Sequence, residues 1–503
     1  MTSLVVRGSP GPGELAQICR PRTQLVLERL TSEGNFEAVE GPVKQYHRTV
    51  QVAETGEVTQ TIDFVLAIPY FAWLFRPAFK RAMSRPETGG FPWWAPPARL
   101  DARAATVLGT LALLAVAFGY LNTLFTQTVA FAGEQFGSTN TAQGLAGGVV
   151  RIGGVVSLVV IASADRRGRR PVVLASAIAG SVLAATGALA PTLSWLAGSQ
   201  LLARGFASAL AALITIMAAE EMPARARAWA VSLMAMAGGL GAGLCVLSLR
   251  LADTGPGGWR LLYLIALLAV PVVLKARHQL PESRRFLAVH PEAPVAGHGR
   301  RLLLIATSGL LASIFVAPQS QFGNQFLRSE RGFSGGRIGL FTILVGTPAA
   351  IGIVAGGRLA DVRGRRVVAA VSLIGGSACT VAFFFSSGWS TWTWAVIGNI
   401  VSAAAIPALG VYGPELFPTS LRGRANGLVT ATGLAGSALG LGLAGALSDQ
   451  FGRIGPAMAT LAVAPLLLAA LVLIAYPETA GAELEDLNPE DLNPADRSPP
   501  DPP

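Results

Sequence analysis

Twelve long stretches of apolar side chains follow one another along most of the chain. Each has about the 20 residues that a helix needs to cross a bilayer, where lipid offers the backbone no hydrogen-bond partner. The pattern predicts spans at 104–130, 141–164, 171–190, 194–218, 226–250 and 259–277, and at 302–327, 337–359, 367–386, 390–412, 426–447 and 454–476. The predicted fold class is an all-α membrane protein with twelve transmembrane helices.

One polar link is longer than the others and divides the spans into two sets. Residues 281–301 follow the sixth span, whereas the remaining links are short. Helices joined by short links pack as neighbours, so each set of six forms its own bundle. We expect a first six-helix bundle over 101–280, a central cytoplasmic loop at 281–301 and a second six-helix bundle over 302–477.

The two ends of the chain lie outside this pattern. Residues 1–100 form an amino-terminal cytoplasmic segment without the apolar core of a signal peptide. Within it, polar and apolar residues partly alternate over 46–62 on both sides of Thr55-Gly56, which predicts a β-hairpin. An apolar stretch that runs into basic residues predicts an interfacial helix at 64–79, with burial in a small amino-terminal domain as the alternative. Residues 478–503 are rich in Pro, Asp and Glu, which predicts a disordered tail.

Composition argues against a soluble enzyme. Hydrophobic residues make up 51% of the chain and charged residues 14%, against about 25% charged in a soluble domain. Three cysteines and four histidines show no metal-ligand spacing, and there is no Gly-Lys-Ser/Thr nucleotide-binding loop. We therefore expect no enzymatic activity, no metal and no cofactor.

The net charge of +10 follows from membrane topology. Positive residues near the ends of spans favour the cytoplasmic side, and alternate links hold 17 Lys or Arg residues on one side and 6 on the other. The larger set is Arg166, Arg167, Arg169, Arg170, Arg225, Arg227, Lys275, Arg277, Arg284, Arg285, Arg300, Arg301, Arg363, Arg365, Arg366, Arg422 and Arg424. The smaller set is Arg250, Arg260, Arg328, Arg331, Arg337 and Arg453. Both termini are predicted to be cytoplasmic, and no nucleic-acid partner is needed to explain the charge.

Three motifs recur at nearly one spacing. Asp165-Arg-Arg-Gly-Arg-Arg170 returns as Asp361-Val-Arg-Gly-Arg-Arg366, 196 residues later. Glu220-x-x-Pro-x-x-x-Arg227 returns as Glu415-x-x-Pro-x-x-x-Arg422 at 195 residues, and Pro281-Glu-Ser returns as Pro477-Glu-Thr at 196. A repeat of this length indicates two homologous halves, and in membrane proteins it points to a carrier with its site between them.

These motifs give the chain a resemblance to a known family. Over about 104–481 it resembles the major facilitator superfamily, and within it the sugar and general metabolite porter branch. The Asp-x-x-Gly-Arg-Arg turn is the superfamily's signature. Tyr412-Gly-Pro-Glu-Leu-Phe-Pro-Thr-Ser-Leu-Arg422 and Pro281-Glu-Ser-Arg-Arg-Phe-Leu287 are similar to signatures of the branch.

The resemblance implies a secondary transporter in the plasma or inner membrane. It would move a small organic solute, a sugar or an organic acid-like metabolite, by alternating access and proton symport, as a monomer in the bilayer. Three alternatives stay open: efflux by proton antiport, a membrane sensor that has lost transport, and facilitated diffusion. The last arises because residues 104–130 contain no Asp or Glu.

The repeated motifs predict a cytoplasmic latch between the bundles. Carboxylates at helix ends can pair with arginines or cap a neighbouring helix, and glycine permits the tight turn; the alternative is that these charges only set topology. The predicted gating residues are Asp165, Arg166, Gly168, Arg169, Glu220, Arg227, Glu282, Asp361, Gly364, Arg365, Glu415, Arg422 and Glu478. One departure from the family pattern is Ile161, where the first turn usually has glycine, while Gly357 keeps that pattern in the second half.

Polar residues within the spans predict the solute site, because they are costly in lipid and tend to face a cavity. The guanidinium fork of an arginine binds a carboxylate or phosphate, although Arg204 could equally be a structural partner for backbone carbonyls. Span 7 carries amides that resemble the hydroxyl-binding segment of sugar porters with altered spacing. The predicted residues are Arg151, Arg204, Asn122, Gln127, Gln319, Gln321, Asn324, Gln325 and Asn399.

Overall fold

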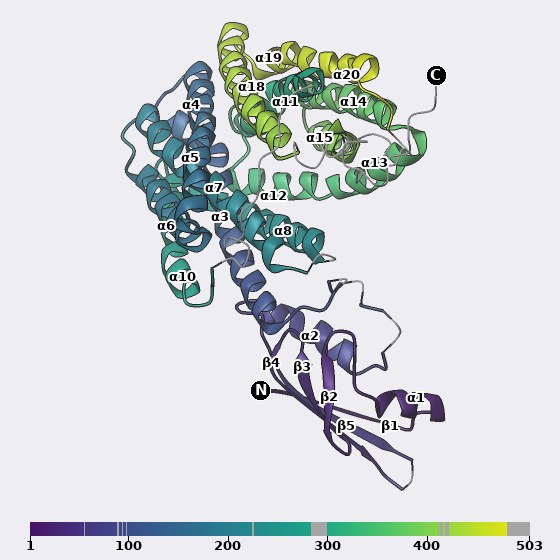
Figure 1. The fold of residues 1–503 in the computed structure, drawn as a ribbon. Coiled ribbons are helices and arrows are strands. Elements are labelled where there is room, and N and C mark those ends of the chain that lie inside the picture. The colour runs from purple at the N-terminus through teal and green to yellow at the C-terminus, as the bar shows by residue number, and fades with distance from the viewer. Residues whose placement is uncertain are drawn as a thin grey trace, which may run out of the picture.

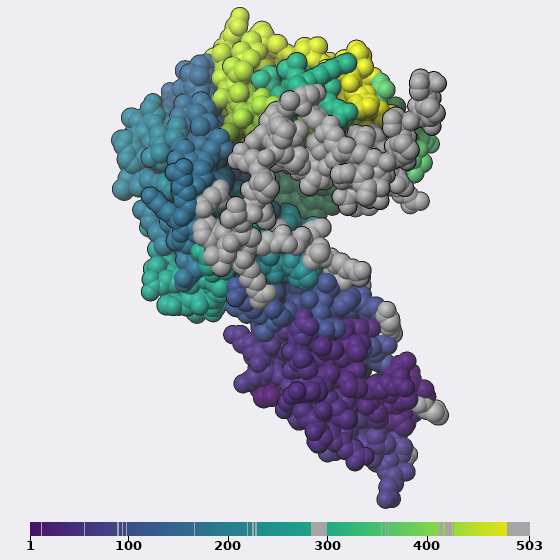
Figure 2. Space-filling view, in the orientation of Figure 1, coloured from purple at the N-terminus to yellow at the C-terminus, as the bar shows by residue number. Residues whose placement is uncertain are grey.

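The structure, a computed structural model, describes most of the chain. The described residues are 1–54, 56–87, 90–92, 94–96, 98–223, 226–282, 299–410, 412, 416–417 and 422–479. They form a helical membrane block and a smaller amino-terminal domain that projects from it (Figure 1). The space-filling view shows the same two parts, with the amino-terminal domain in purple (Figure 2).

The membrane block confirms the twelve predicted spans. The described residues contain 12 helices long and apolar enough to cross a bilayer. In the first bundle they are α3 (Ala102–Gln135), α4 (Asn140–Ile152) with α5 (Gly154–Arg167), α6 (Arg169–Ala185) with η1 (Thr186–Leu189), α7 (Leu193–Glu221), α8 (Arg227–Ser248) with η3 (Leu249–Thr254), and α9 (Trp259–Ile265) with η4 (Ala266–Leu268) and α10 (Ala269–Ala276). In the second they are α11 (Gly299–Gln325) with η5 (Phe326–Glu330), α12 (Gly335–Gly346) with α13 (Ala349–Arg363), α14 (Arg365–Phe385), α15 (Trp389–Ala403) with α16 (Ala405–Gly410), α18 (Arg422–Phe451), and α19 (Ile454–Leu461) with α20 (Val463–Ala475).

Two spans at corresponding positions of the repeat are interrupted within the membrane. The second span breaks at Gly153, between α4 and α5, and the eighth breaks at Thr347-Pro348, between α12 and α13. At the eighth span, Pro348 cannot donate a backbone hydrogen bond, which interrupts the helix. At the second span, Gly153 lies so close to α7 that a side chain there would collide with the carbonyl oxygen of Leu201. Broken helices at matching places in two halves are typical of carriers with a site near the midplane.

A five-stranded antiparallel sheet lies outside the all-α membrane block. Its strands are β1 (Thr2–Gly8), β2 (Leu27–Ser32), β3 (Asn35–Glu40), β4 (Val43–Val52) and β5 (Val58–Leu66), in the order β1-β5-β4-β3-β2. The predicted hairpin is confirmed, since β4 and β5 pair from Val43–Leu66 to Val52–Val58. The sheet is accompanied by α1 (Pro12–Ile18) and α2 (Ala72–Met83).

Two boundary predictions need correction. The predicted helix at 64–79 begins too early, because Phe64, Val65 and Leu66 complete β5 and pair with other strands. The predicted tail at 478–503 also begins too early. Thr479 is fully buried and Glu478 binds the start of α14, while residues 480–503 lie outside the described residues.

A buried ion pair crosses the interior of the amino-terminal domain. The Arg48 guanidinium lies 2.6 Å from the Glu28 carboxylate, and both side chains are almost completely buried. Tyr46 donates its hydroxyl to the same carboxylate, and the Arg22 backbone N–H donates to it at 2.8 Å. Burial raises the pKa of Tyr46 and lowers that of Arg22. Several buried donors thus converge on the Glu28 carboxylate.

The amino-terminal domain is joined closely to the first span. α3 contains 34 residues, or roughly 50 Å at 1.5 Å per residue, which exceeds the ~30 Å hydrocarbon core. Thr106 on α3 donates to the carbonyl oxygen of Ala67 at 2.9 Å, and Pro69 packs where a side chain at Gly109 would stand. The first turns of α3 therefore belong to the interface with the domain.

Replacing Glu28 with Ala should destabilise this domain selectively. Removing one partner of a buried ion pair costs about 3–5 kcal/mol, because the remaining charge stays buried and unpaired. We expect limited proteolysis of the full chain to cut residues 1–66 faster while the membrane block resists as before. The control is Glu37→Ala on the exposed side of β3, and equal proteolysis of both variants would contradict the assignment.

Candidate functional site

The arginine-rich end of each bundle is organised by a tight turn at a glycine. Gly168 has a φ of 96° and Gly364 a φ of 97°, in the left-handed region that favours glycine. Each turn reverses the chain between two spans, α5 to α6 and α13 to α14. The two predicted turns are therefore present at equivalent places.

A glutamate caps the helix that follows each turn. Glu282 accepts from the backbone N–H groups of Arg169 and Arg170, at 2.9 and 3.1 Å. Glu478 does the same for Arg365 and Arg366, at 2.9 and 3.2 Å. Because the first N–H groups of a helix lack partners within the helix and carry partial positive charge, a carboxylate there is favourable.

These contacts on the arginine-rich side join elements of one bundle. Arg169 pairs with Glu220 within the first bundle, and Arg365 donates to Thr479 within the second. Arg166 is exposed. Figure 1 shows α5 and α13, which lead into the two turns, well separated.

The latch between bundles stays a prediction for another conformation. Five of its predicted side chains, Asp165, Arg227, Asp361, Glu415 and Arg422, lie outside the part of the chain whose side chains are described.

The opposite side of the membrane block is closed by two equivalent contacts between bundles. Asp449, at the end of α18, accepts from the backbone N–H groups of Asn140 and Thr141 at the start of α4. Asp253, in η3, accepts from those of Gly335 and Gly336 at the start of α12. Each bundle thus caps a helix of the other. The two aspartates are 196 residues apart, the spacing of the other repeats, and they are not among the residues predicted from the sequence.

Close helix contacts continue from these caps toward the membrane interior. A side chain at Gly144 on α4 would collide with the carbonyl oxygen of Leu441 on α18. At the equivalent Gly339 on α12, a Cβ atom would lie 2.7 Å from the carbonyl oxygen of Val246 on α8. Glycines at equivalent positions of the repeat therefore let the backbones of the two bundles come into contact on this side.

Three of the four predicted amides of span 7 also join the bundles on this side. Gln321 donates to the carbonyl oxygen of Gln143 at 2.9 Å, and Asn324 donates to the side chain of Gln127 at 2.8 Å. Gln325 reaches Asn140 at 3.5 Å. Four predicted site residues, Gln127 included, thus hold the bundles together in this conformation.

An ion pair reinforces the same closure. Arg328 in η5 lies 2.9 Å from Glu134 at the end of α3, and its guanidinium covers the ring of Phe131. Both partners lie at the ends of spans, and Glu134 is largely exposed. Such a pair contributes little alone, about 0–1 kcal/mol, so most of the closure comes from the other contacts between the bundles, including a buried apolar cluster that both bundles share.

Arg151 and Arg204 lie close to each other within the first bundle. Arg151 is in the last turn of α4, next to the break at Gly153, and Arg204 is on α7, which packs against that break. Arg204 has Arg151 as a charged neighbour and donates to the carbonyl oxygen of Asn122 on α3 at 2.8 Å. Among the described residues, neither arginine has a carboxylate within ion-pair distance and Arg151 has no hydrogen-bond partner.

The other predicted site residues are only partly buried. Gln319 on α11 and Asn399 on α15 both have intermediate exposure, as does Asn122. Asn399 donates to the carbonyl oxygen of Ala395 in its own helix. The geometry therefore separates the predicted residues into a pair of adjacent arginines, a group of amides between bundles, and isolated polar groups.

Two bundles that are related by an internal repeat, are closed against each other on one side and each contain a broken helix have the architecture of a secondary transporter. Residues 302–498 match the family model of the Major Facilitator Superfamily. Solved transporters of this fold align with most of the chain, as described below. The second half of the chain therefore matches this family, and the membrane block has the twelve-span, two-bundle fold of its solved transporters, as the resemblance predicted.

Similar solved structures share the fold at low sequence identity. The inward-open xylose transporter XylE from E. coli is 17% identical with a TM-score of 0.62, covering 77% of this chain and 99% of that one. A bacterial homologue of the human lysosomal transporter Spinster, inward-facing and occupied, is 17% identical with a TM-score of 0.62, covering 78% and 99%. The nucleoside transporter NupG is 12% identical with a TM-score of 0.61, covering 74% and 100%. A search of curated proteins finds no match.

Removing both interbundle caps should open the closed side. Asp253→Ala with Asp449→Ala loses two helix caps, each worth about 1 kcal/mol, and both losses weaken the closed state. Spin labels at Ser194 and Ser390, which are exposed at equivalent places in the two bundles, would report the distance between the bundles on this side, in a protein whose Cys19, Cys245 and Cys379 are replaced. We expect a new population of molecules in which the distance between the two labels is longer.

The matched control is Ser334→Ala. Ser334 caps α12 from within its own bundle, so its loss weakens the same helix without releasing the other bundle. An unchanged distance distribution in the double aspartate variant, or an equal change in the control, would contradict the role of the caps.

Proposed function

We propose that this transporter carries a small organic anion through a site at which Arg151 and Arg204 hold its carboxylate or phosphate group. The observation that carries this proposal is the adjacency of two membrane-embedded arginines without a nearby carboxylate among the described residues. Isolated charges are costly inside a membrane protein and are normally paired. An anionic solute supplies the missing partner.

The charge distribution of the spans supports an anion. None of the twelve predicted spans contains Asp or Glu, and Arg151 and Arg204 are the charged residues farthest from span ends. The guanidinium fork binds planar carboxylate and phosphate groups through two parallel hydrogen bonds. Arg204 already donates to Asn122, so Arg151 has more donors left for a solute.

A neutral sugar is the second candidate. XylE is a xylose transporter, and the amides Gln319, Gln321, Asn324, Gln325 and Asn399 offer both donors and acceptors. Three of these amides bind across the bundle interface in this conformation. An organic acid bearing hydroxyl groups would use both the arginines and the remaining amides.

The transport cycle follows from the closed side. With the arginine-rich side placed in the cytoplasm by the positive-inside rule, the structure is closed outside and the solute exchanges with the cytoplasm. In this orientation both termini lie in the cytoplasm. We expect the protein to lie in the plasma or inner membrane. A monomer suffices, because both bundles of the carrier lie within one chain.

Replacing either arginine should weaken transport of an anion specifically. Arg151→Gln removes the guanidinium that no described residue binds, and we expect the KM for an organic anion to rise at least about tenfold, or roughly 1.4 kcal/mol. Arg151→Lys keeps the charge without the fork and should give an intermediate loss. The measurement is uptake of labelled organic acids, sugar phosphates and neutral sugars into proteoliposomes.

The control for lost charge is Arg250→Gln, at the exposed end of the fifth span. It should transport as the unaltered protein does. Uptake of neutral sugars alone, unaffected by Arg151→Gln, would contradict an anionic solute while leaving secondary transport intact.

A proton gradient distinguishes symport from facilitated diffusion. Symport, which the resemblance implies, predicts accumulation of the solute above its external concentration when an inward proton gradient is imposed. The twelve spans predicted from the sequence contain no Asp or Glu to carry the proton, so a solute that itself binds the proton is the simplest route. Equilibration without accumulation, measured in the same proteoliposomes, would contradict symport and establish a uniporter.

A further inference from the structure

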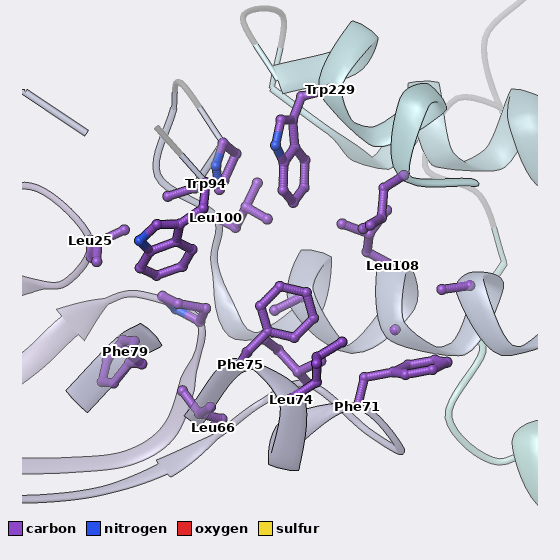
Figure 3. A pocket seen from close by; sticks show the side chains of 18 of the residues that line it. Leu25, Leu66, Phe71, Leu74, Phe75, Phe79, Trp94, Leu100, Leu108 and Trp229 are labelled. Atoms are coloured by element: carbon purple, nitrogen blue, oxygen red, sulfur yellow. The ribbon is translucent and has the colours of Figure 1, made fainter. Parts of the chain in front are cut away.

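An apolar pocket lies where the amino-terminal domain meets the membrane block. Phe71, just before α2, and Phe75 and Phe79 of α2 form one wall, and Leu108 of α3 and Trp229 of α8 form another (Figure 3). Trp94 and Leu100, in the segment that leads into α3, and Leu25 and Leu66 from the domain complete the lining. None of these residues belongs to the predicted solute site.

Water is a poor occupant of this pocket. Its cavity of about 110 Å³ far exceeds the ~10–15 Å³ that one water needs, but a buried water also requires two to four polar partners. Arg99 is the charged residue of the lining, and its guanidinium is bound by Gln24, Thr23 and Glu40. The pocket therefore suits a hydrocarbon group.

The pocket opens onto an exposed apolar face of the fifth span. Met236 and Leu240 line it and are 58% and 56% exposed. They continue along one face of α8 as Leu244 and Leu247, which are 53% and 60% exposed. This spacing of three and four residues is a single helical stripe. A chain of hydrocarbon can pass from the bilayer into the pocket along it.

The helix beside the pocket carries unpaired positive charge. Arg76 and Arg81 of α2 are exposed, Lys80 is partly exposed, and their side chains make no ion pair among the described residues. The neighbouring Trp73 and Leu74 are 69% and 52% exposed. Apolar and basic side chains together on one helix suit the surface of a leaflet that contains anionic lipid.

We propose that this pocket binds one acyl chain of an anionic phospholipid from the leaflet on the arginine-rich side. The chain enters past Met236 and Leu240, and the headgroup stays at the surface near the basic residues of α2. The site is separate from Arg151 and Arg204 and does not depend on the solute. The bound acyl chain would fill the space between the amino-terminal domain and the spans.

Photolabelling of the full chain tests this site. The protein is placed in nanodiscs that contain phosphatidylglycerol with a photoreactive diazirine in its acyl chain, and labelled peptides are mapped by mass spectrometry. We expect labels on α2 and on 229–240 of α8. Met236→Trp blocks the entrance from an exposed position and should lower this labelling at least about fivefold.

Two controls make the outcome decisive. Leu247→Trp changes the same exposed stripe beyond the pocket and should leave labelling of α2 unchanged. Phosphatidylcholine with the same diazirine chain should label the pocket several-fold less than phosphatidylglycerol does. Labelling spread evenly over the lipid-facing spans and indifferent to Met236→Trp would overturn the acyl-chain site, and equal labelling by the two lipids would overturn the anionic headgroup.

Discussion

A carboxylate bound to the first backbone N–H groups of a helix is the interaction on which this structure depends. It occurs at two pairs of repeat-related positions, Glu282 with Glu478 and Asp253 with Asp449. The glutamates cap helices of their own bundles and so build each bundle's arginine-rich end. The aspartates cap helices of the opposite bundle and so hold the two bundles together on the other side. Because hydrocarbon satisfies no backbone group, helix ends near the membrane surface need such partners.

The internal repeat makes this arrangement suitable for alternating access. Equivalent residues perform equivalent contacts, as with Gly144 against Leu441 and Gly339 against Val246. The closed side is held by a few caps, amides and close backbone approaches, together with a cluster of buried apolar residues drawn from both bundles. Alternating access requires these contacts to be exchanged for a second set on the other side. The break at Gly153 places irregular backbone beside Arg151 and Arg204.

The spans and the repeat could be predicted from the sequence, because span length and motif spacing are set by membrane thickness and by duplication. The aspartate caps also had a signal, the offset of 196 between Asp253 and Asp449, but single aspartates at span ends are not distinctive. Most of the sheet was missed because β2 and β3 pair irregularly and their alternation is weak. The contacts of Gln321 and Asn324 could not be predicted, since they depend on which side of the carrier is closed.

Reversible cross-linking of the closed side tests the central claim most directly. A Cβ atom at Gly148 on α4 would lie 3.4 Å from the Cα atom of Ala438 on α18, so Gly148→Cys with Ala438→Cys can form a disulfide between the bundles in a background without the native cysteines. The account predicts that oxidation abolishes solute flux into proteoliposomes and that reduction restores it, while either single variant is insensitive to oxidation. Undiminished flux through the fully cross-linked protein would contradict alternating access by separation of the two bundles.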